Sequence, residues 1–178
     1  MSQDEFVLLL ILANKTLSSA ITRYFRRNEG TTDYATIPEV TLAGDFVVEF
    51  DAIINNASSL TGQIVIGNSE NPTGFIRFNN GVLQLNTTTG GGLAVFDNIV
   101  LADNELTGFT ISYVSSTSTL TATSSTGLSQ SITFTVLSMV VDRIYSKHGK
   151  FMSGILANLK IWDNGTLIRD YPINDGKN

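Results

Sequence analysis

The sequence contains no cysteine, three prolines, one tryptophan and one histidine in 178 residues. Without cysteine there is no disulfide framework, no thiolate nucleophile and no cysteine-ligated zinc. The single histidine, His148, would be the only histidine base for serine hydrolysis, and no nucleophile-elbow pattern of glycines surrounds any serine. Stability must therefore come from packing, and the chain is long enough for one domain that buries about 70% of its unfolded surface.

Charged side chains are also scarce. They make up 15% of the residues, the net charge is -5, and residues 106–141 carry no charge at all. The only dense basic cluster is Arg23, Arg26 and Arg27, which is too small for a phosphate backbone, so we expect no nucleic-acid partner. Open sheet edges normally carry charges that block pairing, so we expect the uncharged segment to be covered by neighbouring strands or by subunit contacts.

The apolar run near the N-terminus is short. Residues 6–12 are all apolar, but Asp4 and Glu5 precede them where a secretory signal carries positive charge, and a run of seven cannot span a bilayer. The sequence therefore predicts neither classical export nor a membrane span. We interpret residues 1–21 as an arm, helix or strand, that anchors the chain to a neighbouring subunit; alternatively the segment lies on the domain's own core. The candidate assembly residues are Phe6, Leu9, Leu10 and Leu17.

From Tyr34 onward the sequence reads as short strands separated by Gly, Asn, Asp and Ser clusters, with no long helical pattern. In residues 46–54 the apolar side chains at even positions alternate with a mixed face that holds Glu49 and Asp51. Residues 107–114 alternate in the same way, and Asn79-Asn80-Gly81 suits a hairpin turn between two further strands. Many strands at spacings of about ten residues predict an all-β, two-sheet antiparallel β-sandwich.

The C-terminal segment predicts a closing β-hairpin. Asp163-Asn164-Gly165 supplies the turn, because Asn and Gly accept the positive φ that a tight hairpin needs. Before it, a period of two predicts a core face and an opposite face. The expected core face is Ile155, Ala157, Leu159 and Ile161, and the opposite face is Leu156, Asn158, Lys160 and Trp162. Trp162 is thus the candidate ligand-binding residue, because an exposed ring can stack on a sugar.

These landmarks together resemble a known family. The residues are Asp33-Tyr34, Ile37-Pro38, the 44–51 strand, Gly67-Asn68 and the 151–162 segment. Residues 22–171 resemble laminin-G-like, concanavalin A-type jelly rolls, particularly those within bacteriophage structural proteins such as tail fibres. The resemblance implies a jelly-roll domain over 22–178 with a short N-terminal extension. The 103–108 segment departs from the family pattern, so the resemblance implies no binding role at that turn.

Two chemical alternatives follow from the same resemblance. Laminarinase-like glucanases carry a third acidic residue after a pair such as Glu49 and Asp51, but positions 53 and 54 are both Ile, so we expect no catalytic residues. Laminin-G-like domains often hold calcium through Asp and Asn oxygens. The conceivable ligands here are Asp103, Asn104, Asp142, Asp163 and Asn164. No recognised calcium loop is present, so we predict no metal site and no cofactor. A bound calcium ion is the less favoured alternative.

The sequence thus favours a non-enzymatic bacteriophage virion protein, in a fibre, tail or decoration, that displays its jelly roll for attachment to a host-surface carbohydrate. Its expected partners are other virion proteins, a second copy of itself in a homo-oligomer, and a host glycan. It would be made in the bacterial cytoplasm and end in the virion. The alternative is a free-standing carbohydrate-binding, lectin-like protein, and a glycoside hydrolase is a further one.

Overall fold

The computed structural model describes residues 26–29, 34–54, 62–70, 73–89, 92–136, 138–144, 146–147 and 150–171. The proposed arm over residues 1–21, with Phe6, Leu9, Leu10 and Leu17, lies outside these residues, as does His148. In the described part the chain forms strands and one short 3-10 helix, η1 (Ser115–Thr117). None of the helices in that part is long and apolar enough to cross a bilayer.

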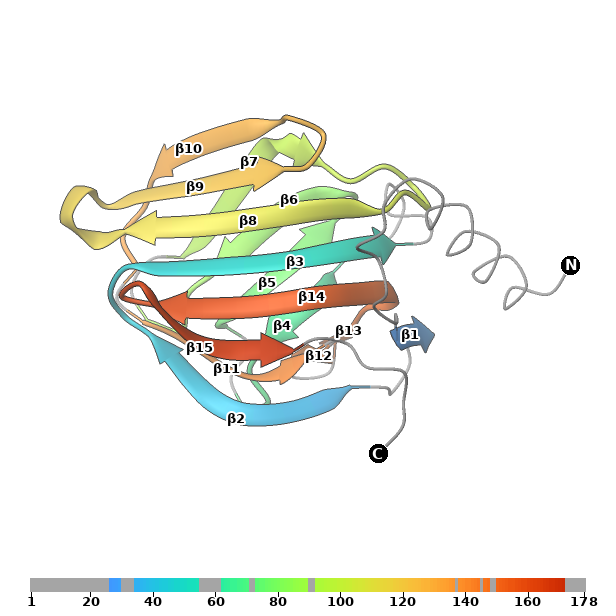
Figure 1. Ribbon diagram of the computed structural model, residues 1–178, viewed down its shortest axis with the longest axis horizontal. Coiled ribbons are helices and arrows are strands. Elements are labelled where there is room, and N and C mark those ends of the chain that lie inside the picture. Colours follow the sequence, from blue (N-terminus) through green and yellow to red (C-terminus); the bar gives the residue numbers. More distant parts are fainter. Residues whose placement is uncertain are drawn as a thin grey trace, which may run out of the picture.

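Two large antiparallel sheets face each other, as Figure 1 shows. The seven-stranded sheet runs in the order β1 (Arg26–Glu29), β14 (Ser153–Asp163), β3 (Phe46–Ile54), β8 (Thr107–Val114), β9 (Thr119–Ser124), β10 (Ser129–Thr133), with β15 (Thr166–Tyr171) also paired to β14. The six-stranded sheet runs β2 (Ala35–Leu42), β11 (Met139–Ile144), β4 (Gln63–Gly67), β5 (Phe75–Asn79), β6 (Val82–Asn86), β7 (Leu93–Val100). A small third sheet pairs β12 (Ser146–Lys147) with β13 (Lys150–Phe151), antiparallel. The predicted all-β, two-sheet antiparallel β-sandwich is confirmed.

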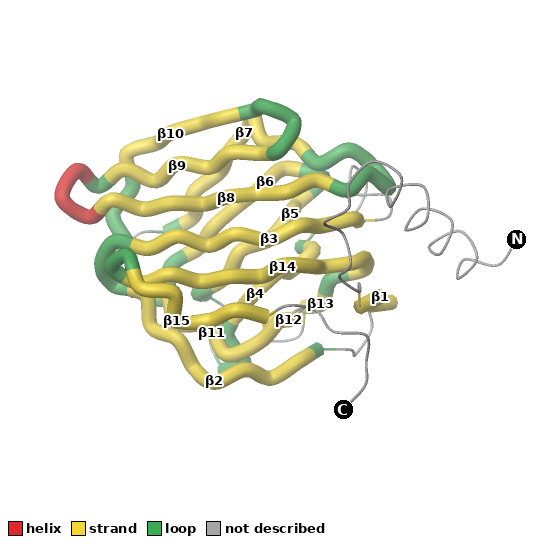
Figure 2. The backbone as a smooth tube through the Cα atoms, viewed as in Figure 1, coloured by secondary structure: helices red, strands yellow, loops and turns green. Residues whose placement is uncertain are grey.

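The core lies between the two sheets, and Figure 2 shows the strands that enclose it. Along β3 the even positions from 46 to 54 are buried and the odd positions from 47 to 51 are half-buried, as the alternation predicts. Phe50 packs against Phe109 from the same sheet and Phe78 from the opposite one, with ring centroids 5.3 Å and 6.4 Å away. Aromatic contacts across both sheets hold β3 and β8 in place beneath the outer face.

Both predicted hairpin turns are confirmed. Asn80 and Gly81 between β5 and β6 have φ values of 51° and 78°, and Asn164 and Gly165 between β14 and β15 have 47° and 77°. Two successive positive φ values match the twist of the flanking strands. The Asn164 backbone N–H also donates to the Asp45 carbonyl at 2.7 Å, which ties this turn to the start of β3.

The expected face assignment on β14 is wrong in its first half. From Ala157 to Lys160 β14 advances by three residues, while its partners on β3 advance by two, from Asp51 to Glu49. β14 therefore contains a β-bulge. Asn158 lies in the bulge with φ of 52°, a value that Asn tolerates better than most residues. Leu156 therefore belongs to the core, whereas Ile155 and Ala157 pair with outward-facing residues of β3 and lie outside the core cluster. Leu159 and Ile161 face the core, as predicted.

The uncharged segment 106–141 supplies β8, β9 and β10 and the start of β11. β8 and β9 are interior strands of their sheet, so neighbouring strands cover them as expected. β10 is an edge strand, and its Gln130 side chain reaches the opposite sheet, where Oε1 accepts a hydrogen bond from the Asn98 N–H of β7 at 2.9 Å. The two sheets are thus joined at this side of the sandwich, and β10 keeps one outer edge without a strand partner among the described strands.

Candidate functional site

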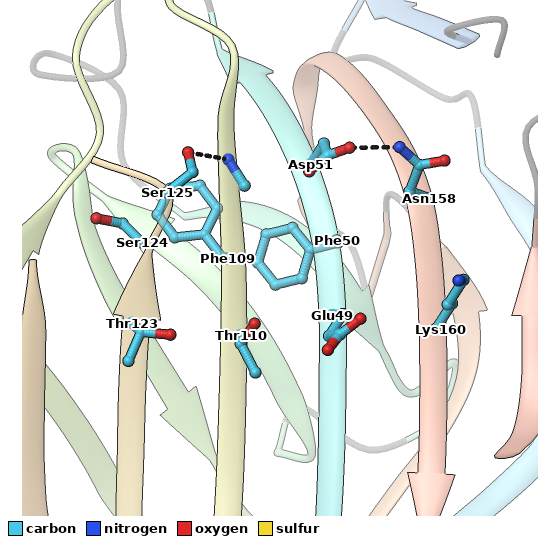
Figure 3. Close-up of a pocket in the computed structure, with 11 residues that line it drawn as sticks. Glu49, Phe50, Asp51, Phe109, Thr110, Thr123, Ser124, Ser125, Asn158 and Lys160 are labelled. Atoms are coloured by element: carbon cyan, nitrogen blue, oxygen red, sulfur yellow. Dashed lines mark hydrogen bonds between the residues drawn. The ribbon is translucent and has the colours of Figure 1, made fainter. Parts of the chain in front are cut away.

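A groove of about 500 Å³ lies on the outer face of the seven-stranded sheet. It crosses four neighbouring strands, β9, β8, β3 and β14. Its described lining residues are mostly polar, as Figure 3 shows: Glu49, Phe50, Asp51, Gly108, Phe109, Thr110, Thr123, Ser124, Ser125, Asn158 and Lys160. Three spacings between strands amount to about 14 Å, which is longer than one pyranose ring.

One row of side chains crosses the groove in register. Thr123 on β9 pairs with Thr110 on β8, Thr110 pairs with Glu49 on β3, and Glu49 pairs with Lys160 on β14. Paired residues present their side chains on the same face of a sheet, about 5 Å apart. The register therefore places two hydroxyls, a carboxylate and an ammonium group in line across the sheet (Figure 3).

Asp51 and Asn158 form a second polar group in the groove. The Asn158 side-chain amide donates a hydrogen bond to the Asp51 carboxylate, drawn dashed in Figure 3. Burial raises the pKa of Asp51 above its ordinary value, and the hydrogen bond from Asn158 opposes this shift. The β14 bulge is what turns Asn158 toward Asp51, so a local irregularity builds this pair.

Gly108 makes room for the Asp51 carboxylate. A Cβ at position 108 would lie 2.8 Å from Asp51 Oδ1 and 3.5 Å from the Ser125 Cβ. The Gly108 N–H donates to Ser125 Oγ at 3.0 Å, and its carbonyl accepts from the Ser125 N–H at 2.8 Å. The turn after β9 is thereby fixed against β8 and forms one wall of the groove.

Trp162 does not line the groove but lies on the same outer face. It is half-buried on β14, two residues from Lys160, and pairs with Val47 on β3 and Leu167 on β15. Two residues of strand correspond to about 7 Å. The structure thus places the predicted aromatic beside the groove, and whether it binds a ligand stays a prediction.

Glu49 and Asp51 lie on the outer face of β3, as the alternation predicts. Ile53, the next outward-facing position, is buried and pairs with Ile155. The third carboxylate of the glucanase pattern is therefore replaced by an apolar contact. No motif in the sequence marks Gly108, Thr110, Thr123 or Lys160 as site residues. Their outward positions could be read from the period of two, but their strand partners could not.

The conceivable calcium ligands are scattered. Asp103 and Asn104 lie in the loop before β8. Asp163 ends β14 and Asn164 lies in the turn that follows, where the Asn164 Nδ2 donates to Asp163 Oδ1 at 3.3 Å. Asp142 on β11 accepts hydrogen bonds from the backbone N–H and hydroxyl of Ser69. Across the described residues, no cluster of three or more His, Cys, Asp or Glu side chains is arranged to hold a metal.

Comparisons with known proteins agree with the architecture. No protein-family model matches the sequence, and no curated protein matches it. Two similar solved structures are a candidate carbohydrate-binding protein from Bacteroides ovatus (TM-score 0.58, 10% identity, 83% of this chain and 45% of that chain) and mouse laminin α1 domains LG4-5 (0.53, 11%, 87% and 46%). A tailspike protein of bacteriophage CBA120 aligns with a TM-score of 0.48 at 10% identity over 89% of this chain and 35% of that one.

Identities this low show the fold alone, and the chain spans less than half the length of the first two proteins. The fold defines this chain as a jelly-roll sandwich of the laminin-G and concanavalin A type. The fold does not by itself assign a function, since jelly rolls of one architecture serve different functions.

Proposed function

We propose that this chain is a non-enzymatic carbohydrate-binding module whose glycan lies in the groove on the outer face of the seven-stranded sheet. The observation that carries the proposal is the polar lining on four neighbouring strands, which presents carboxylates, an amide, an ammonium group and hydroxyls in one open groove. The fold shared with the Bacteroides ovatus protein, itself described as a candidate carbohydrate-binding protein, supports the same reading.

The groups in the groove match the chemistry of sugar hydroxyls. Carboxylates such as Asp51 accept hydrogen bonds from hydroxyls, an ammonium such as that of Lys160 donates, and Ser and Thr hydroxyls do both. The bond from Asn158 fixes the Asp51 carboxylate before any ligand arrives, which lowers the entropy lost on binding. A sugar ring that extends beyond the groove would reach Trp162, where an aromatic face can stack on it.

Binding without hydrolysis fits the arrangement on β3. The glucanase pattern needs a further acidic residue beyond Glu49 and Asp51, and Ile53 occupies that outward position in an apolar pair. We therefore expect no glycoside hydrolysis, and a Glu49→Gln variant would have no activity to abolish. Release of reducing sugar by the native chain, lost in that variant, would refute this part of the proposal.

A glycan array followed by titration calorimetry tests the binding site. We expect the native chain to bind at least one glycan class and Asp51→Asn to weaken that binding at least tenfold, about 1.4 kcal/mol. Asp97→Asn is the matched control, because it removes the same charge from an exposed position on β7 in the other sheet. Equal affinity in both variants would place the ligand outside the groove.

We further propose that the module is carried by a bacteriophage particle, where it self-associates and contacts other virion proteins, and that it attaches the particle to a host-surface glycan. The edge strand β10 supports self-association, because an uncharged edge without proline or bulge can pair with the same strand of a second copy. The resemblance of the sequence to jelly rolls of phage structural proteins supports the location.

Solution mass by light scattering tests this assembly. We expect the full chain to form a defined oligomer and Thr133→Lys, at an exposed position on β10, to reduce it to a folded monomer. Thr126→Lys in the exposed turn after β9 adds the same charge away from the edge and should leave the mass unchanged. A native chain that is already a monomer would favour the free-standing lectin-like alternative.

A further inference from the structure

The one basic side chain among the groove's described lining residues is flanked by acidic ones. Lys160 pairs in register with Glu49 on β3 and with Asp170 on β15. Directly opposite side chains in an antiparallel pair lie about 5 Å apart, so two carboxylates offset the charge of one ammonium group. Lys160 can therefore donate a hydrogen bond to a hydroxyl, but it presents little net positive potential to an anion.

Asp51 carries a charge that its strand neighbours do not offset. It lies opposite Ala157 on β14 and Gly108 on β8, both of which are uncharged. Its hydrogen-bond donor is the Asn158 amide, which orients the carboxylate but does not neutralise it. The low exposure of Asp51 reduces screening by solvent, so a second negative charge in contact with this carboxylate would be strongly repelled.

The other polar side chains among the described lining residues are uncharged. Thr110, Thr123, Ser124 and Ser125 contribute hydroxyls, which both donate and accept hydrogen bonds. Such groups recognise the hydroxyls of an uncharged sugar, whereas arginine forks are the usual partners of carboxylates and sulfates. The described residues that line this groove include no arginine.

We propose that the groove selects glycans without acidic groups, namely neutral sugars and amino sugars, and rejects glycans that carry uronic acids, sialic acids or sulfate. This inference rests on the proposed carbohydrate-binding function and names its ligand class. An amino group on the sugar is compatible with it, because Glu49 and Asp51 attract a cation. An acidic group placed over the same carboxylates should weaken binding at least tenfold.

The first experiment compares glycan classes on the native full chain. An array of neutral, amino-bearing and acidic glycans is read at about 0.01 M and about 0.15 M ionic strength. We expect signals for neutral glycans that do not change with salt, signals for amino glycans that fall with salt, and none for acidic glycans at either. Acidic glycans bound as strongly as neutral ones would overturn the selectivity alone, whereas no binding by any class would overturn the proposed function with it.

The second experiment changes the charge of the groove. Glu49→Gln keeps the size of the side chain and removes one negative charge, so acidic glycans should gain about threefold to tenfold in affinity. Asp97→Asn makes the same change in net charge on β7, outside the groove, and should leave acidic glycans unbound. Equal gains in the two variants would show that net charge rather than the groove governs selection, and would refute the inference.

Discussion

Replacing Gly108 with alanine would place one methyl group against the Asp51 carboxylate. The new Cβ would lie 2.8 Å from Asp51 Oδ1, about 0.6 Å inside the 3.4 Å at which ordinary contact begins. Gly108 does not have a positive φ, so alanine fits its backbone and the strain falls on Asp51. The carboxylate must move away from β8, which disturbs its hydrogen bond with Asn158.

The expected cost in stability is small because two effects oppose each other. Losing a hydrogen bond to a charged group costs about 1.5–3 kcal/mol. Replacing glycine by alanine at a compatible backbone position stabilises by about 0.4–1 kcal/mol, because the unfolded chain has fewer conformations. The net loss is about 1–2 kcal/mol, which for a chain of this size lowers the melting temperature by about 2–8 °C.

The effect on ligand binding should be larger than the effect on stability. The methyl group and the displaced carboxylate both occupy the groove, so we expect at least a tenfold loss of glycan affinity by calorimetry. Ser112→Thr is the matched control, because it adds a methyl group on the same face of β8 outside the groove lining. It should change neither affinity nor melting temperature by a comparable amount.

A double-mutant cycle tests the mechanism. Asn158→Gly removes the amide and keeps a residue that accepts the positive φ of the bulge. If Gly108→Ala acts through the Asp51 pair, its destabilisation should disappear when Asn158 is already glycine, with a coupling of about 1 kcal/mol or more. Additive effects of the two substitutions, or an unchanged affinity in Gly108→Ala, would refute the reasoning.

Three further predictions concern stability and titration. Burial raises the folded pKa of Asp51 above its ordinary value of 3.8, so the folded chain binds the proton more tightly than the unfolded chain. The free energy of unfolding should therefore fall as pH rises from 3.8 through the raised value. In urea unfolding the native chain should show this pH dependence and Asp51→Asn should lack it, and parallel pH profiles would contradict the prediction. Hydrogen bonds from the Ser115 hydroxyl and N–H lower the pKa of the exposed Asp45. Ser115→Ala should therefore raise the pKa of Asp45 toward 3.8 in an NMR titration, and an unchanged pKa would rule out the hydroxyl as a cause. A Cβ at Gly154 would clash with the Ile53 carbonyl oxygen, so Gly154→Ala must separate β14 from β3 and should cost about 3 kcal/mol by thermal unfolding. A variant as stable as the native chain would mean that the strands pair differently there.

Much of the architecture follows from local signals. The alternation along residues 46–54 and 107–114 predicts β3 and β8 nearly to their ends, because each strand has one face on the core. Paired Asn and Gly residues mark both hairpin turns, since few other residues adopt successive positive φ values at low cost. By contrast, no equally clear alternation or turn signal predicts β7 and β11.

The bulge in β14 marks the limit of this reasoning. A period of two assigns Ile155 and Ala157 to the core face, and nothing in the local pattern signals the extra residue at Asn158. The bulge becomes visible only when β14 is aligned with β3. It is also what directs the Asn158 amide to Asp51, so the Asp51–Asn158 pair could not be predicted from β14 alone.

The sequence by itself determined the all-β class, the outward positions of Glu49 and Asp51 and the turns that connect the strands, because these depend on neighbours within a few residues. Only the tertiary structure decided that β9, β8, β3 and β14 lie side by side, and hence that Thr123, Thr110, Glu49 and Lys160 form one row. Strand order and register depend on packing between segments up to about a hundred residues apart, which local periodicity does not encode.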